Sequence, residues 1–143
     1  FGPQWTRSPL DHSDMIVVPE LLGNIDIDLC LFDHVEPATP GPGDNNWLRI
    51  CRNTGSKAPG KGTIRVTRSI VHGDRYASYL IQIAHGAGYT PELELDEVCL
   101  PISRIGMGKL FHPSTPLGAV RWGRVYDTDT GALVAAPAGT VAI

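Results

Sequence analysis

The sequence lacks any apolar run long enough to span a membrane as a helix. Hydrophobic residues make up 42% of its 143 residues, but no stretch approaches the roughly 18 consecutive apolar residues that such a span requires. Basic charge is also scarce, because 12 Lys and Arg residues stand against 15 Asp and Glu residues, a net charge of −3. Nucleic-acid-binding domains usually carry a basic surface. We therefore expect neither a membrane span nor a nucleic-acid partner.

Sequence patterns for catalysis and metal binding are missing as well. The five histidines are scattered, no serine lies in a Gly-x-Ser-x-Gly elbow, and the three cysteines form no Cys-x-x-Cys pair. The segment Asp127-x-Asp129-x-Gly131 begins like a calcium loop, but Leu133 and Val134 follow where further oxygen ligands are needed. The sequence therefore predicts no enzyme, no catalytic residue, no metal site and no cofactor.

Turn-forming residues are plentiful by contrast, with 16 Gly and 12 Pro. They separate short segments in which apolar and polar residues alternate, as they do in half-buried strands. No segment shows a helical period. The expected strands are residues 15–18, 25–31, 46–51, 63–70, 77–84, 92–96, 98–102, 119–126 and 132–135, with a hairpin turn at 127–131.

Short strands that recur about every ten residues are typical of a β-sandwich. We therefore expect an all-β, immunoglobulin-like two-sheet sandwich over residues 19–143, with residues 1–18 as an extended arm or edge strand and the 127–135 hairpin near the C-terminus. The alternation pattern predicts a buried core that includes Leu29, Leu48, Ile50, Ile64, Val66, Ile83 and Leu95.

The order of motifs between residues 19 and 100 resembles the CARDB-type immunoglobulin-like modules of bacterial and archaeal cell-surface proteins. The matching motifs are PELL, IDIDL, WLRICRNTGSKAPG, IRV, IAHGAGY and LEL, with Asn53, Gly55 and Ala58 in the first turn and residues 86–88 in the later one. Residues 101–143 depart from the family's pattern. The resemblance implies a seven-strand sandwich used for adhesion, spacing or assembly, with no catalytic residues to carry over.

Two cysteines share strand positions that could bring them together. Cys30 falls on the side of its strand that carries Asp26 and Asp28, and Cys51 falls on the side that carries Arg49. A disulfide between Cys30 and Cys51 would form if these strands were neighbours. The alternative is that all the cysteines are small buried thiols, and the state of Cys99 stays open.

The two ends of the chain carry apolar residues among Pro and Gly. Because an extended apolar segment can add a strand to the sheet edge of a neighbour, we expect these ends to contact copies of the same protein and build a filament. The alternative is that both ends fold back on their own domain as extra edge strands. The expected assembly contacts are Trp5, Met15, Ile16, Val17, Val18, Val141 and Ile143.

These features together predict a non-enzymatic, extracellular structural or adhesive module that assembles into a surface filament. The start at Phe1 rather than Met suggests a processed, secreted protein, and the alternative is that the sequence was cut at this point from a longer one. The alternative function is a carbohydrate-binding module, because aromatic side chains on a sandwich face can stack on sugars. Trp47, on the polar side of its strand, is the expected sugar or partner contact.

Overall fold

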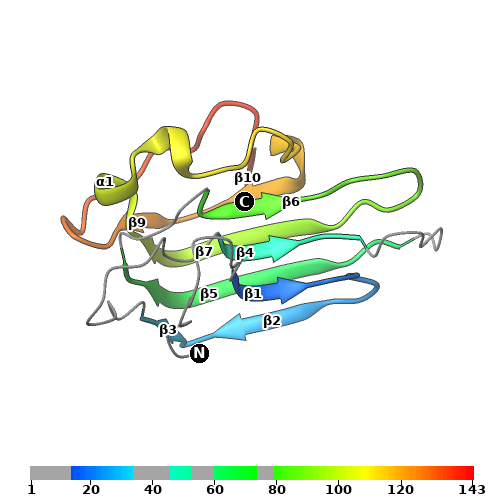
Figure 1. The fold of residues 1–143 in the computed structure, drawn as a ribbon. Helices are drawn as coiled ribbons and strands as arrows, with labels where there is room; N and C mark the ends of the chain where they lie inside the picture. The colour runs from blue at the N-terminus through cyan, green and yellow to red at the C-terminus, as the bar shows by residue number, and fades with distance from the viewer. Residues whose placement is uncertain (1–13, 34–45, 53–59, 74–78) are drawn as a thin grey trace, which may run out of the picture.

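The computed structural model describes residues 14–33, 46–52, 60–73 and 79–143. Strands dominate this part of the chain, and the helices are short (Figure 1). The strands are β1 (Asp14–Val18), β2 (Ile25–Asp28), β3 (Leu31–Phe32), β4 (Asn46–Ile50), β5 (Thr63–Val71), β6 (Ile81–Ile83), β7 (Glu92–Leu100), β8 (Val120–Trp122), β9 (Val125–Asp127) and β10 (Val141–Ala142). The helical turns are α1 (Ile102–Ile105), η1 (Met107–Lys109) and η2 (Leu117–Ala119).

The strands stack in parallel into two sheets. Sheet A has the order β1-β4-β6, and sheet B has the order β10-β8-β7-β5-β2, with β3 on β5 and β9 on β7. The chain therefore winds through both sheets once per coil: coil 1 holds β1 to β3, coil 2 holds β4 and β5, coil 3 holds β6 and β7, and coil 4 holds Phe111, β8 and β9. A chain that winds in this way is a parallel β-solenoid.

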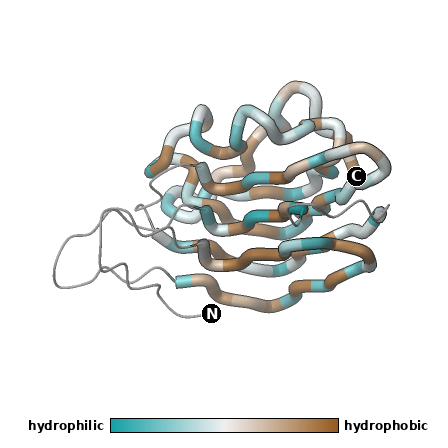
Figure 2. Tube along the Cα trace, turned by 45° about the vertical axis from the view of Figure 1, so that its right-hand side comes forward, coloured by the Kyte–Doolittle hydropathy of each residue, from teal (hydrophilic) through white to brown (hydrophobic). Residues whose placement is uncertain are grey.

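Parallel pairing aligns equivalent residues of successive coils in columns. One inward column of sheet B runs through Ile25, Ile64, Leu93 and Val120, at sequence spacings of 39, 29 and 27 residues (64 − 25, 93 − 64 and 120 − 93). Apolar and polar positions alternate along the strands (Figure 2). The inward side chains of both sheets meet in one apolar core, which supplies most of the stability of such a stack.

An outward column of sheet B alternates acid and base. It runs through Asp26, Arg65, Glu94 and Arg121. Arg65 donates to Glu94 at 2.9 Å and to Asp26 at 3.1 Å, and Arg121 lies 3.5 Å from the other oxygen of Glu94. Opposite charges in directly paired positions support the register of neighbouring strands.

Sheet B bends at the same position in each of the first three coils. Leu29, Arg68 and Glu97 have φ values of 55°, 46° and 55°, in the left-handed region that non-glycine residues seldom adopt. Each lies two residues after a paired inward position, namely Ile27, Val66 and Leu95. The bend lets a single strand such as β7 continue around the core.

The expectation of an all-β fold is confirmed, but the immunoglobulin-like two-sheet sandwich is wrong. Each pairing of named strands in the described residues is parallel, whereas a sandwich of that class is antiparallel. The seven-strand sandwich that the CARDB resemblance implied is wrong for the same reason. Alternation along one strand is the same in both arrangements, so it carries no information on the direction of the neighbours.

Most of the expected core is confirmed. The side chains of Leu48, Ile50, Ile64, Val66, Ile83 and Leu95 are completely buried. Leu29 is the exception, because it occupies a bend and is 71% exposed. Within the described residues, no helix is both long and apolar enough to cross a bilayer.

Candidate functional site

The outer side of β2, here called the open edge, ends sheet B at coil 1 (Figure 1). The described residues include no strand paired with this side of β2. Ile25 is 39% exposed, whereas the other members of its column, Ile64, Leu93 and Val120, are completely buried. Among the described residues, Ile25 has a neighbouring strand on one side only, whereas Ile64, Leu93 and Val120 lie in strands with a neighbour on each side.

More apolar side chains surround the open edge. Leu22, Leu29 and Leu31, all in coil 1, are more than half exposed. Unpaired strand edges beside exposed apolar side chains favour association with another strand. Coil 1 therefore offers both the backbone groups and the apolar surface that strand addition requires.

The charges of β2 are acidic. Asp26 binds Arg65, and Asp28 accepts hydrogen bonds from Thr67 and from Arg68 at 2.8 Å each. The hydrogen bonds from Arg68 and Thr67 lower the pKa of Asp28, so this carboxylate stays ionised at neutral pH. The outward groups of the open edge are thus negative, with their basic partners all on the side of β5.

The opposite end of sheet B is covered by the chain itself. The segment 132–134 lies antiparallel to β9, where Val134 N–H donates to the Val125 carbonyl at 2.8 Å. We call this segment and β10 together the cap. β10 lies parallel to β8. Trp122 donates from Nε1 to the Val134 carbonyl at 3.3 Å. As a result, the inward side chains of coil 4 in sheet B are buried, unlike Ile25.

Asp127 holds the turn from which the cap begins. Its carboxylate accepts from the backbone N–H and hydroxyl of Ser103 at 2.8 and 2.9 Å, and from those of Thr130 at 3.0 and 2.8 Å. Burial raises the pKa of Asp127, but these hydrogen bonds outweigh it and lower the pKa to about 2. The predicted hairpin turn is confirmed. Asp127 binds backbone and hydroxyl groups of the protein, and Asp129 accepts from the Arg104 guanidinium at 2.7 Å.

The expectation that Trp47 is an exposed sugar or partner contact is wrong. Trp47 is completely buried and packs edge-on against Phe32, with ring centroids 5.5 Å apart. The Leu80 carbonyl accepts from the N–H groups of both Trp47 and Leu48, at 2.9 and 3.1 Å. Two residues of β4 thus face one residue of the next coil, as in a β-bulge. This irregularity turns consecutive side chains inward and breaks the parity on which the prediction depended.

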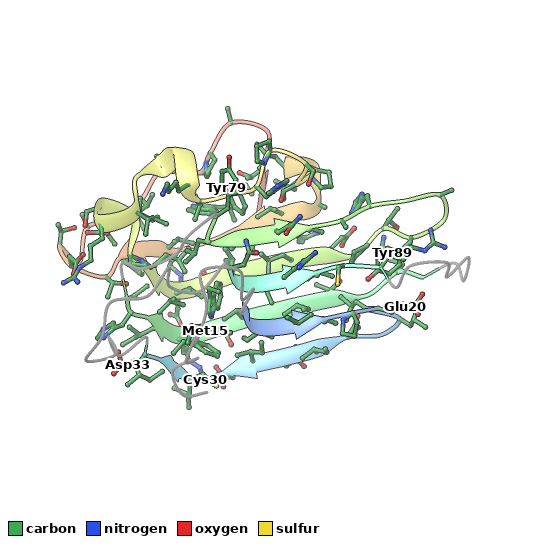
Figure 3. All side chains as sticks on the ribbon, viewed as in Figure 1. Met15, Glu20, Cys30, Asp33, Tyr79 and Tyr89 are labelled. Carbon is green, nitrogen blue, oxygen red and sulfur yellow. The ribbon has the colours of Figure 1, made fainter. Side chains whose placement is uncertain are left out.

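The expected assembly contacts divide into buried and exposed residues. β1 pairs with β4 of the same chain, and Met15 and Ile16 are buried in the common core (Figure 3). Val18 packs against that core, whereas Val17 is 48% exposed. Val141 and Ile143 are exposed in and beside β10. Trp5 lies outside the described residues. The alternative in which the ends fold back on their own domain thus holds for β1 and β10.

The cysteines are free thiols, so the disulfide expected between Cys30 and Cys51 is not formed. Cys30 lies at the bend between β2 and β3 in sheet B, where its N–H donates to Ser69 Oγ (Figure 3). Cys51 follows β4 in sheet A, and its N–H donates to Val18. The two strands are therefore not neighbours. Burial raises the pKa of the Cys99 thiol, and the charge of Asp127 adds to this effect.

Histidine and serine meet once in the described part of the chain, within a tight turn. His112 Nδ1 lies 2.7 Å from Ser114 Oγ, and the N–H of Ser114 donates to the same nitrogen at 3.1 Å. The hydrogen bond from the backbone two residues along stabilises the turn, as the side chains of Asx turns do. Among the described residues, no group of three or more His, Cys, Asp or Glu side chains could hold a metal ion.

Tyr89 joins three coils, a role that the sequence reading missed. Its hydroxyl accepts from Leu21 N–H of coil 1 at 2.8 Å and donates to the Cys51 carbonyl of coil 2 at 2.9 Å, while its ring belongs to coil 3 (Figure 3). Close packing continues at Gly62, where a Cβ would lie 2.1 Å from the Gly23 carbonyl oxygen. These contacts fix coil 1, and with it the open edge, to the rest of the stack.

Comparisons with family models, with curated proteins and with solved structures found no match to this chain. The resemblance to CARDB modules therefore gains no support from them, and the open edge is the site on which a functional argument can be built.

Proposed function

We propose that this chain is a non-enzymatic structural module that joins another polypeptide by strand addition at the open edge. The observation that carries the proposal is the exposure of Ile25 in a column whose other members are completely buried. An added strand would cover Ile25 and pair the backbone groups on the outer side of β2, where no strand of the described residues lies, as occurs in other proteins that bind partners by β-augmentation.

The non-enzymatic part of the proposal is supported by how the reactive side chains are used. Asp127 organises a turn, the Nδ1 atom of His112 accepts from the backbone of the same turn, and His85 Nε2 lies 2.8 Å from the Pro91 carbonyl. Each of these groups stabilises the local chain path. The carbohydrate-binding alternative depended on exposed aromatic side chains, with Trp47 as the expected contact, and the burial of Trp47 removes that contact. The extracellular location and the self-assembly into filaments stay predictions of the sequence.

A selection of displayed peptides on the full chain tests the proposal. We expect the enriched peptides to be extended sequences with alternating apolar residues. Their binding should be lost in the Ile25→Asp variant, because a charge then lies where the added strand must pack. Val141→Asp is the matched control: Val141 is 43% exposed, close to the 39% of Ile25, but lies on the cap. Peptides that lack this pattern, or that bind Ile25→Asp as well as the unmodified chain, would refute strand addition at β2.

A further inference from the structure

We propose that the strand added at the open edge carries a basic side chain in register with Asp26, and that it belongs to a different protein rather than to a second copy of this chain. This inference rests on the proposed function, because it specifies the partner of the same edge.

The charge of the partner follows from the alternation of charge across sheet B. Arg65 lies between Asp26 and Glu94 and binds both, and Glu94 lies between Arg65 and Arg121 and contacts both. Within this column each inner charge therefore has an opposite charge on both sides. The opposite charge that Asp26 binds, Arg65, lies on the side of β5, and the side chain of Asp26 is 69% exposed. The next position outward from Asp26 continues the alternation only if it is basic.

The bend supplies no second basic position. Arg68 binds Asp28 of the preceding coil, and Arg124 binds both Asp96 and Glu97 of the preceding coil, at 3.0 and 2.9 Å. In both cases the arginine of the later coil reaches back to a carboxylate of the earlier coil. A partner strand on the outer side of β2 takes the earlier position, beside Leu29, so the basic side chain of the partner is specified by Asp26.

A second copy of the chain fits this edge poorly. Two open edges related by a two-fold axis would bring Asp26 and Asp28 of one copy against the same acids of the other, and like charges in facing strands are destabilising. A head-to-tail contact would place the open edge against β10, where Val141 and Ile143 are exposed but residues 132–143 contain no basic side chain to bind Asp26. Acidic charge on the edge thus selects against self-pairing and favours a basic strand.

The sequence of β5 provides a probe with the required pattern. In the stack, Thr63–Val71 pairs with β2 so that Arg65 faces Asp26 and Arg68 binds Asp28. A labelled peptide TIRVTRSIV, in parallel register on the outer side of β2, would place its first arginine beside Asp26. The matched probes are TIQVTQSIV, which is neutral at both arginine positions, and TIEVTESIV, which is acidic.

The experiment measures binding of the three peptides to the full chain by fluorescence anisotropy, with hydrogen exchange of residues 25–28 as the readout of position. We expect the arginine peptide to bind about fivefold more tightly than the glutamine peptide at low salt, and the glutamate peptide to bind most weakly. High salt should reduce the preference. Asp26→Asn should reduce it as well, whereas Glu92→Gln, with the same charge change two strands away, should leave it intact.

Each alternative outcome has a separate meaning. If all three peptides bind equally and protect residues 25–28, strand addition stands and the basic partner is refuted. If none binds or protects the edge, the proposed function itself is refuted. If the chain forms oligomers that Ile25→Asp dissolves and that exclude the peptides, the occupant is a second copy and the assignment to a different protein is overturned.

Discussion

The last coil of the stack covers its own apolar columns, whereas the first coil leaves them in contact with solvent. Val120 and Ile25 occupy the same column, yet Val120 is completely buried behind β10 and Ile25 is partly exposed. Stacked repeats generally need terminal units that shield the last apolar face. In coil 4 the apolar columns are shielded by an added segment of chain, the cap, which pairs with β8 and β9. They are not replaced by polar residues.

Removing the cap should break this difference most strongly. A chain that ends at residue 131 lacks the strands that cover Trp122 and Val125. Because exposing two large apolar side chains costs about 1.5–3 kcal/mol each, we expect a loss of about 3–6 kcal/mol in the free energy of unfolding, measured by urea denaturation. Leu133→Ala, at a side chain that is 66% exposed, is the control and should change stability little. An equally stable truncated chain would show that the cap does not shield the stack.

Alanine substitutions along one column should show the difference between an inner coil and the open edge. Leu93→Ala creates a cavity at a completely buried position and should cost about 2–5 kcal/mol of unfolding free energy. Ile25→Ala lies in the same column but is already partly exposed, so its cost should be below about 1 kcal/mol. Equal losses in thermal or urea unfolding would mean that the open edge is covered in solution.

The pH dependence of stability should reveal the turn at the start of the cap. Because the folded-state pKa of Asp127 is lowered to about 2, its charge stabilises the fold above the unfolded pKa of about 3.9. That contribution is lost as the pH falls from about 4 to about 2. Asp127→Asn should cost about 1–3 kcal/mol at neutral pH, and the gap to the unmodified chain should close over that acidic range. Asp129→Asn, at an exposed carboxylate, should show a smaller effect, and a constant gap at all pH values would contradict the assignment.

Substitutions in the outward column of alternating charges should change the free energy of unfolding least. This column runs through Asp26, Arg65, Glu94 and Arg121. Arg65→Gln removes contacts with both Asp26 and Glu94, whereas Asp26→Asn removes only one. Because exposed ion pairs contribute little to stability, we expect only a small loss in the free energy of unfolding for Arg65→Gln and a smaller one for Asp26→Asn. High salt should reduce both losses in urea denaturation. Equal, salt-independent losses would show that charge pairing does not distinguish inner strands from the edge.

The sequence predicted where the strands lie better than how they pair. A short apolar run located the strand near β1, and alternation located those near β5 and β7 and identified core residues such as Val66 and Leu95. It missed the parallel arrangement because side-chain alternation has a period of two in either direction. A usable signal was present: IDI, IRV, LEL and VRW repeat an apolar–charged–apolar pattern with alternating sign. Loops of unequal length make its spacing irregular, so a search for a fixed period does not find it.

Residue contacts that depend on irregular backbone could not be predicted from alternation. Trp47 turns inward because two residues of β4 share one carbonyl of the next coil, and Leu29 turns outward because the chain bends there. The open edge is a property of the whole stack: among the described residues, Ile25 has a neighbouring strand on one side only, whereas Ile64 has one on each side. No pattern within a single segment contains that information.

The spacing of the columns has a consequence for how the chain folds. Partners in the Ile25 column are separated by 27 to 39 residues (120 − 93 and 64 − 25), so each coil must close a long loop before its contacts form, and such topologies fold slowly. The entropy lost on closing a loop changes little over this range of lengths, so no inner coil should form much faster than another. Tyr126 and Leu133, by contrast, meet across only seven residues (133 − 126). We expect ordering to start at this hairpin and proceed coil by coil, so that the strand which forms last and frays first is β2.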